Sequence, residues 1–439
     1  MEWWQSLCLA VVMILVLMAA RYPVAFVFLT VNLGMFAMFM NGFNGMKMFT
    51  VSLLDSLNTF TMVAVPMFML MGDVLFRSGM AMRAIGAMER ILGRVPGRLS
   101  VLASVVGIIF AATSGSVMAN TAMLGTLLVP EMEKKGYAKK MIFGPIMGVS
   151  GLAMLIPPSA LAVLYASMAQ ISVGKVLIGG IVPGLIMGVL FIAYIIVTTT
   201  LHPELAPSYH IKATPALEKL RMFASDVLPL GVLIFLVIGT IIMGIATPLE
   251  AAALGALGAF LLCVYNRTLT WKLASDCALS TLKTVGMVFA VVAGTVGFGQ
   301  MLAFTGAVSN LSKLALGMDV HPVVIIIITQ VIVLVLGFFI DVVPIMMMTI
   351  PIFYPIILQL GYDPIWFACL NLINMSMANI TPPFGMILFV MKGVAPKGTT
   401  MQQIYSSVMP YIVIDAFVIV LMVAFPKVIL WLPGAMYGG

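Results

Sequence analysis

Two stretches of the sequence place adjacent prolines and small polar residues inside long apolar segments. They read IPPS at residues 156–159 and TPPFG at residues 381–385. A proline inside a helix removes a backbone hydrogen bond, so each pair predicts a break in a helix. Carbonyls freed at a break suit a small hard cation such as Na⁺, and a helix N-terminus suits an anion. At the later break we expect Thr381 to be the N-cap of a second half-helix and Pro382 its first helical residue.

Polar residues also occupy two further segments, TSGS at 113–116 and GFFIDVVP at 337–344. Together with the breaks, these segments supply the candidate cation ligands, through side-chain or backbone oxygens. The candidates are Ser114, Gly115, Asn120, Ser150, Gly151, Asp341, Asn374, Ser376, Thr381 and Pro382.

Asp341 is the most informative single candidate. A carboxylate at bilayer depth costs roughly 2.5 kcal/mol or more, so it needs a compensating partner. A bound cation, a substrate hydroxyl or protonation of the carboxylate would each provide compensation, and the alternative is a loop exposed to water. Asp73 has a simpler explanation, because Arg77 follows it at helical i,i+4 spacing. The sequence offers no explanation for Asp415, which lies in the last apolar segment.

The surrounding chain is too apolar for a soluble core. Of its 439 residues, 62% are hydrophobic and only 8% are charged, and the mean hydropathy is +1.18. Apolar runs of spanning length recur from end to end, which predicts an all-α polytopic protein embedded in a lipid bilayer. The net charge of +7 forms no basic tract with aromatic residues, so no nucleic acid partner is predicted. Since HExxH, GxSxG and P-loop motifs are missing, we do not expect an enzyme.

The same pattern of prolines, glycines and tyrosines recurs at an offset of 225 residues. The matched residues are Pro130 and Pro355, Gly136 and Gly361, Tyr137 and Tyr362, and Pro157 and Pro382. Such spacing predicts two homologous halves, over residues 1–200 and 228–425. A linker over 201–227 joins them, and a tail over 426–439 follows.

Charge predicts how the halves are oriented. Arginines and lysines flank the apolar block at 98–133 in the first half, whereas the equivalent places in the second half carry only Lys313 as a basic residue. Because positive residues stay in the cytoplasm, the repeat is predicted to be inverted, with a cytoplasmic linker and periplasmic termini.

The block at 98–133 must then enter and leave the bilayer on one side, as a re-entrant hairpin. Its counterpart spans 322–358. A broken helix follows each hairpin, at 141–172 and 364–395. Segments 42–57 and 267–283 are expected to lie along the interfaces as arms.

Each half therefore offers one hairpin tip beside one helix break, and two such sites facing each other are typical of secondary transporters. We place no Arg or Lys inside this cavity, so an anionic substrate would be balanced by helix ends and co-transported cations. A stand-alone Na⁺-coupled dicarboxylate or citrate carrier of related architecture fits this pattern nearly as well. A channel is a further alternative that the two inverted half-sites disfavour.

The segment FAATSGSVMANTA at 110–122, the IPPS and TPPFG breaks and the double-proline spacing resemble the large membrane subunit of tripartite ATP-independent periplasmic (TRAP) transporters. The resemblance covers essentially the whole chain. It implies a bacterial inner-membrane protein that pairs with a small four-helix membrane subunit, here a separate polypeptide, and receives substrate from a periplasmic binding protein. It also implies coupling to a Na⁺ gradient and an elevator motion of a transport domain against a scaffold.

The substrates implied by the resemblance are small organic acids such as sialic acid or C4-dicarboxylates. Ser116, Ser159 and Asp341 are the substrate contacts that it suggests. We add Asn379 and Thr381, the polar residues next to the second break.

Overall fold

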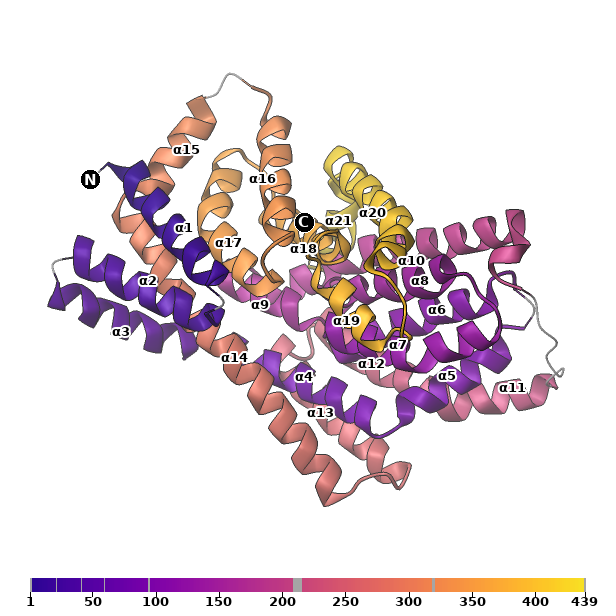
Figure 1. Cartoon of the computed structure of the whole chain (residues 1–439). Helices are drawn as coiled ribbons and strands as arrows, with labels where there is room; N and C mark the ends of the chain where they lie inside the picture. Colours follow the sequence, from indigo (N-terminus) through magenta and orange to yellow (C-terminus); the bar gives the residue numbers. More distant parts are fainter. Residues whose placement is uncertain are drawn as a thin grey trace.

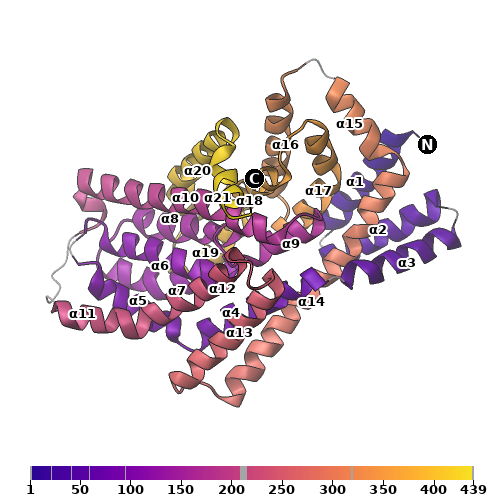
Figure 2. The same cartoon turned by 180° about the vertical axis from the view of Figure 1, so that it is seen from behind.

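The computed structural model describes residues 2–20, 22–40, 42–58, 60–93, 95–207, 215–317 and 320–437. Within these ranges the chain is helical and contains no β-strand (Figures 1 and 2). The helices of the first half are α1 Trp3–Ala19, α2 Val24–Phe39, α3 Phe43–Leu57, α4 Ala64–Arg77, α5 Met80–Ile91, α6 Arg98–Ser114, α7 Val117–Lys134, α8 Lys139–Ser150, α9 Ala160–Met168 and α10 Val173–Leu201. Those of the second half are α11 Ala216–Met222, α12 Leu228–Ile242, α13 Pro248–Tyr265, α14 Trp271–Phe304, α15 Ala307–Gly317, α16 Pro322–Gly337, α17 Val342–Gln359, α18 Pro364–Ile380, α19 Met386–Val394, α20 Met401–Ala424 and α21 Lys427–Tyr437.

The order of the helices repeats along the chain. Shifted by 225 positions, α7 coincides with α17, and α6, α8, α9 and α10 fall on α16, α18, α19 and α20. The hairpin of α6 and α7 lies where the sequence predicts the first hairpin, and α16 and α17 lie where it predicts the second. Whether the two halves are inverted across a membrane, and whether the hairpins re-enter it, stay predictions.

Six helices among the described residues are long and apolar enough to cross a bilayer. A seventh candidate is the pair α4 and α5, which bends by 64° at Ser78 and Gly79. Gly79 adopts a φ of +78°, a conformation that favours glycine. Large apolar side chains are exposed along α12, α13 and α20, as lipid-facing helices require.

Two of the expected boundaries, at 283 and 227, fall inside continuous helix. The arm predicted at 267–283 and the span after it form one unbroken helix, α14, which packs on α2, α3 and α4. The end of the predicted linker at 227 lies inside continuous helix, because a π-helical turn at Phe223–Val227 joins α11 to α12. The predicted tail contains α21, which packs on α10. Polar residues alone do not end a helix, and residues 267–283 contain no proline or glycine that would. Linker residues 208–214 and tail residues 438–439 lie outside the described part of the chain.

The helices that carry the breaks form the centre of the molecule. Every residue of α8 from Met141 to Ser150 is buried, as is every residue of α18 from Ile365 to Ile380. A helix that is apolar all round must be packed on every side. Helix α18 accordingly contacts α10, α16, α17 and α20 (Figure 1).

Glycines allow α8 to approach α20 closely. A Cβ atom at Gly148 would lie 2.9 Å from Cγ of Tyr411, which is too short for two carbon atoms. We expect Gly148→Ala to lower the free energy of unfolding by about 1–3 kcal/mol, because the ring of Tyr411 has to move. Thermal unfolding of the purified protein measures this change.

The matched control is Gly231→Ala on α12, where a Cβ atom meets nothing within 4 Å. This variant is expected to keep or slightly raise the stability, because alanine favours a helix over glycine by about 1 kcal/mol. Equal melting temperatures for the two variants would contradict the close packing of α8 and α20.

Candidate functional site

Both hairpin tips place a polar side chain at the start of a helix. Gly115 is the C-cap of α6, and its φ of +56° favours glycine. Ser116 follows as the N-cap of α7, where its hydroxyl accepts a hydrogen bond from Ala119 N at 3.3 Å. Asp341 has the same role in the second half, where its Oδ1 atom accepts a hydrogen bond from Val342 N at 2.8 Å. Both caps therefore lie at the positive ends of helix dipoles. The side chain of Ser114 lies outside the described residues.

The first break interrupts the chain between α8 and α9. A short 3₁₀ segment, η2 Gly151–Met154, follows α8, and α9 begins only at Ala160. Ser159 is the N-cap of α9: its hydroxyl accepts a hydrogen bond from Ala162 N at 3.2 Å and donates one to Met154 O at 2.9 Å. The side chain of Ser159 thereby connects the two sides of the break.

The second break differs from the prediction. Thr381 is the C-cap of α18 rather than the N-cap of α19, and its hydroxyl donates to Met377 O at 2.7 Å. Pro382 is not helical, and α19 begins four residues after it, with Gly385 as N-cap. Here Gly385 N donates to Thr381 O at 3.2 Å, so a turn delays the second half-helix. The Pro-Pro peptide bonds of both breaks are cis.

Each hairpin tip packs on the break of its own half. In the first half, a Cβ atom at Gly115 would lie 3.5 Å from Ala160 N and 3.8 Å from Pro158 O. In the second half, the rings of Phe339 and Phe384 have centroids 5.8 Å apart. The predicted pairing of tip and break is therefore present in both halves.

The two halves meet where Gly151 contacts Ser376. A Cβ atom at Gly151 would collide with the hydroxyl of Ser376, so glycine is required for this approach. Ser376 is 1% exposed, and its hydroxyl has no hydrogen-bond partner within the described part of the chain. This crossing brings a candidate ligand of the first break next to one of the second.

The other candidates are more dispersed. Asn120 donates across the first hairpin to Gly107 O at 3.2 Å, and its buried Oδ1 atom has no partner among the described residues. Ser150 donates to Ile146 O of its own helix at 2.7 Å, and Asn379 is 5% exposed. Asp341 shows no described polar contact with the first half. Among the described residues, no group of three or more His, Cys, Asp or Glu side chains could hold a metal ion.

A buried chain of amides was missed by the sequence analysis. Asn374 donates to Gln330 Oε1 at 2.9 Å, Gln330 donates to Asn371 Oδ1 at 3.1 Å, and Asn371 donates to the hydroxyl of Tyr165 at 2.7 Å. The chain joins the second hairpin, α18 and α9. The i,i+3 spacing of the two asparagines, with an isolated glutamine in the apolar run of α16, was the available signal.

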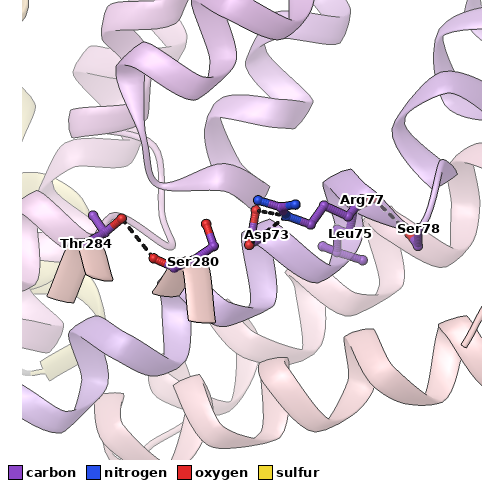
Figure 3. A network of polar contacts seen from close by, with 6 residues as sticks. All are labelled: Asp73, Leu75, Arg77, Ser78, Ser280 and Thr284. Carbon is purple, nitrogen blue, oxygen red and sulfur yellow. Dashed lines mark hydrogen bonds and ion pairs between the residues drawn. The ribbon is translucent and has the colours of Figure 1, made fainter. Parts of the chain in front are cut away.

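A pocket lies between the first hairpin and helices α4 and α14. Ser116 and Asn120 line it together with Asp73 of α4 and with Ser280 and Thr281 of α14. The Nε atom of Arg77 contacts both carboxylate oxygens of Asp73 at 3.0 Å, which confirms the predicted pair (Figure 3). Within the described part of the chain no Lys or Arg lines this pocket. Its polar groups are hydroxyls, one amide and the carboxylate of Asp73, which is paired with Arg77.

Comparisons with known proteins point to the same family over nearly the whole chain. The model of a protein family described as "Tripartite ATP-independent periplasmic transporter, DctM component" matches residues 11–428. The "C4-dicarboxylate TRAP transporter large permease protein DctM" of Pseudomonas aeruginosa is 28% identical, over 89% of this chain and 90% of its own length. The "2,3-diketo-L-gulonate TRAP transporter large permease protein YiaN" of Escherichia coli is 27% identical, over 86% and 88%. The "Isethionate TRAP transporter permease protein DctMQ" of Oleidesulfovibrio alaskensis is 29% identical, and the chain spans 59% of its length.

Two solved transporter structures share the fold. The YdaH transporter of Alcanivorax borkumensis has a TM-score of 0.67 at 13% identity, over 92% of this chain and 97% of that one. MtrF of Neisseria gonorrhoeae has a TM-score of 0.62 at 16% identity, over 89% and 85%. At these identities the likeness concerns the fold alone.

Breaking the amide chain should destabilise the centre of the molecule. We expect Asn371→Leu to lower the free energy of unfolding by about 1–3 kcal/mol, because the amide of Gln330 loses its buried acceptor. Thr126→Ala is the control, since Thr126 is exposed and its hydroxyl bonds only to Ala122 O of its own helix. Equal melting temperatures for the two variants would show that the amide chain contributes no stability.

Proposed function

The chain belongs to the DctM family of tripartite ATP-independent periplasmic (TRAP) transporters, and from that premise we propose that it carries out Na⁺-coupled uptake of a small organic acid anion. It is the large permease component of such a transporter, an integral protein of the inner membrane and not an enzyme. Its proposed partners are the small four-helix membrane subunit and a periplasmic substrate-binding protein.

The observation that carries the proposal is the crossing of the two helix breaks at Gly151 and Ser376. Backbone groups at the breaks lie in the most buried part of an apolar protein, where water cannot satisfy them all. A Na⁺ ion is proposed to bind their oxygens, together with those of the hairpin tips. The capped N-termini of α7, α9 and α17 add positive potential for an anion, without any basic side chain.

The pocket beside the first hairpin is proposed as the substrate site. Its hydroxyl and amide groups, including those of Ser116 and Asn120, would bind the polar atoms of a small anion. The relatives are named for C4-dicarboxylates, isethionate and 2,3-diketo-L-gulonate, which are all small organic anions. A C4-dicarboxylate is therefore a better first candidate than sialic acid.

Transport is proposed to follow an elevator motion. The hairpins and broken helices would move as one domain against a scaffold that includes α2, α3, α4, α13 and α14. Inversion of the two repeats would give the domain equivalent outward and inward positions. A stand-alone Na⁺-coupled carrier is the alternative, and affinity purification from the native membrane distinguishes the two, since only the proposed assembly retains a small membrane subunit.

Uptake by proteoliposomes that contain the assembled transporter and its binding protein tests the Na⁺ coupling. We expect uptake to stop when Na⁺ is replaced by choline, and Asp341→Asn to reduce Na⁺-driven uptake at least tenfold, about 1.4 kcal/mol. The amide still offers an oxygen to Val342 N, so the cap of α17 is retained while the negative charge is lost.

Asp363→Asn is the matched control, because Asp363 also caps a helix, α18, through Ile365 N and Trp366 N. It is expected to keep the wild-type rate. Unchanged uptake without Na⁺ would refute the proposed coupling, and a wild-type rate for Asp341→Asn would remove Asp341 from it.

A further inference from the structure

The pocket beside the first hairpin has an acid on its wall, and this acid has a basic partner. Asp73 of α4 lines the pocket, and its side chain is 21% exposed. Both of its carboxylate oxygens lie 3.0 Å from the Nε atom of Arg77. An exposed i,i+4 pair of this kind contributes only about 0.3–0.5 kcal/mol to stability. Stability alone therefore does not account for an acid on the wall of a pocket.

Arg77 uses only part of its hydrogen-bonding capacity. A guanidinium carries N–H donors on Nε and on both terminal nitrogens. Within the described part of the chain, the hydrogen bonds of the Arg77 side chain all run from Nε to Asp73. The side chain of Arg77 is 39% exposed, so its terminal nitrogens are accessible. Such an end of a guanidinium binds a carboxylate through two parallel hydrogen bonds.

Arg77 continues the face of α4 that lines the pocket. Met69 and Asp73 line the pocket, and Arg77 follows at the same i,i+4 spacing. Side chains at this spacing lie one above the other on a helix, so Arg77 extends the wall of the pocket by one turn. Helix α4 ends at Arg77, and Phe76 and Ala81, on either side of the following bend, also line the pocket. The guanidinium thus lies at the edge of the pocket.

The contact with Asp73 restricts the guanidinium at this edge. Figure 3 shows the carboxylate of Asp73 between the guanidinium of Arg77 and Ser280 of α14, which lines the same pocket. A long side chain loses rotamer freedom when it binds a ligand, and this loss weakens the binding. Because Asp73 already holds the Nε atom of Arg77, part of this cost is met before a ligand arrives.

The charges around the pocket permit an anion only because Arg77 is present. An anion next to Asp73 alone would be repelled by the carboxylate. The Asp73–Arg77 pair has no net charge, and it presents N–H donors toward the pocket edge. The other polar groups of the lining are neutral hydroxyls and the amide of Asn120.

We propose that Arg77 binds the acid group of the substrate through its terminal nitrogens, and that Asp73 positions the guanidinium by holding Nε. The inference rests on the proposed function, because it concerns the proposed substrate site. It adds a basic contact to the hydroxyls, the amide and the helix ends already assigned to that site. A planar guanidinium end fits a carboxylate better than an ammonium group does, which makes Arg77 a determinant of specificity for carboxylic acids.

Equilibrium binding of radioactive succinate to the purified transporter assembly, in Na⁺ and without the binding protein, tests this contact. We expect Arg77→Gln to weaken binding at least tenfold. Arg77→Lys keeps the positive charge but lacks the planar end, and we expect it to bind at least threefold more weakly than the wild type. Arg83→Gln on α5 is the matched control, because Arg83 is exposed, bonds to Asn266 and does not line the pocket. This variant is expected to keep the wild-type affinity.

The double variant Asp73→Asn/Arg77→Gln separates substrate binding from charge compensation. Its pocket wall is neutral, as in the wild type, but the guanidinium is gone. We expect succinate binding to remain at least tenfold weaker. A return to the wild-type affinity would show that Arg77 only compensates the charge of Asp73, and would overturn the inference.

The remaining outcomes are also distinguishable. Wild-type affinity in Arg77→Gln, with a monodisperse elution profile, would overturn the inference. If Arg77→Gln does not fold, wild-type affinity in Arg77→Lys overturns the end-on contact instead. If the wild type itself binds no succinate, the proposed substrate site fails together with this inference. Succinate binding by the wild type that is undiminished in the double variant rejects this inference alone.

Discussion

The structure depends on one constraint, which is that peptide groups released from a helix inside an apolar protein must find new partners. Water is not available there, and an unsatisfied buried group costs free energy comparable to a lost hydrogen bond. The chain interrupts two central helices, and it covers each interruption with the tip of a hairpin from the same half. Side chains at the helix starts then satisfy part of the released groups, as Ser116, Ser159 and Asp341 do.

Glycine makes this arrangement sterically possible. Gly151 lets the first break contact Ser376, and Gly148 lets α8 lie against the ring of Tyr411. The backbone can therefore approach from several directions at once, and its dipoles converge on a small volume. Converging backbone dipoles can hold a charged ligand with little help from basic or acidic side chains. Charged side chains are costly to place at this depth in a membrane. Asp341, at the tip of the second hairpin, is the acid that this account assigns to Na⁺ binding.

Much of the architecture was readable from the sequence because its signals are local. Proline pairs predict helix breaks wherever they occur, and the 225-residue offset predicts that helices recur. The spacing of Asp73 and Arg77 predicts their ion pair for the same reason. The Thr381 prediction was wrong because both a threonine before a proline pair and a glycine four residues later can start a helix, and the turn that decides between them depends on tertiary packing.

The other features that the sequence did not predict depend on how distant helices pack on one another. Nothing near residue 283 tells whether α14 continues, because its length is set by packing on α2, α3 and α4. The amide chain from Asn374 to Tyr165 joins three helices far apart in the sequence, so its members could not be paired in advance. The unpartnered state of the Ser376 hydroxyl likewise becomes visible only when the helices are assembled.

The account stands on the burial of both hairpin tips within the membrane. Its most direct test places single cysteines at positions 115 and 341 of a cysteine-free transporter in permeabilised cells, in which both faces of the membrane are accessible, and measures labelling by a membrane-impermeant maleimide, with and without Na⁺. We expect both positions to react much more slowly than a cysteine at the exposed position 267, in the turn after α13, and Na⁺ to slow them further. Labelling of both tips as fast as that position, regardless of Na⁺, would contradict the account.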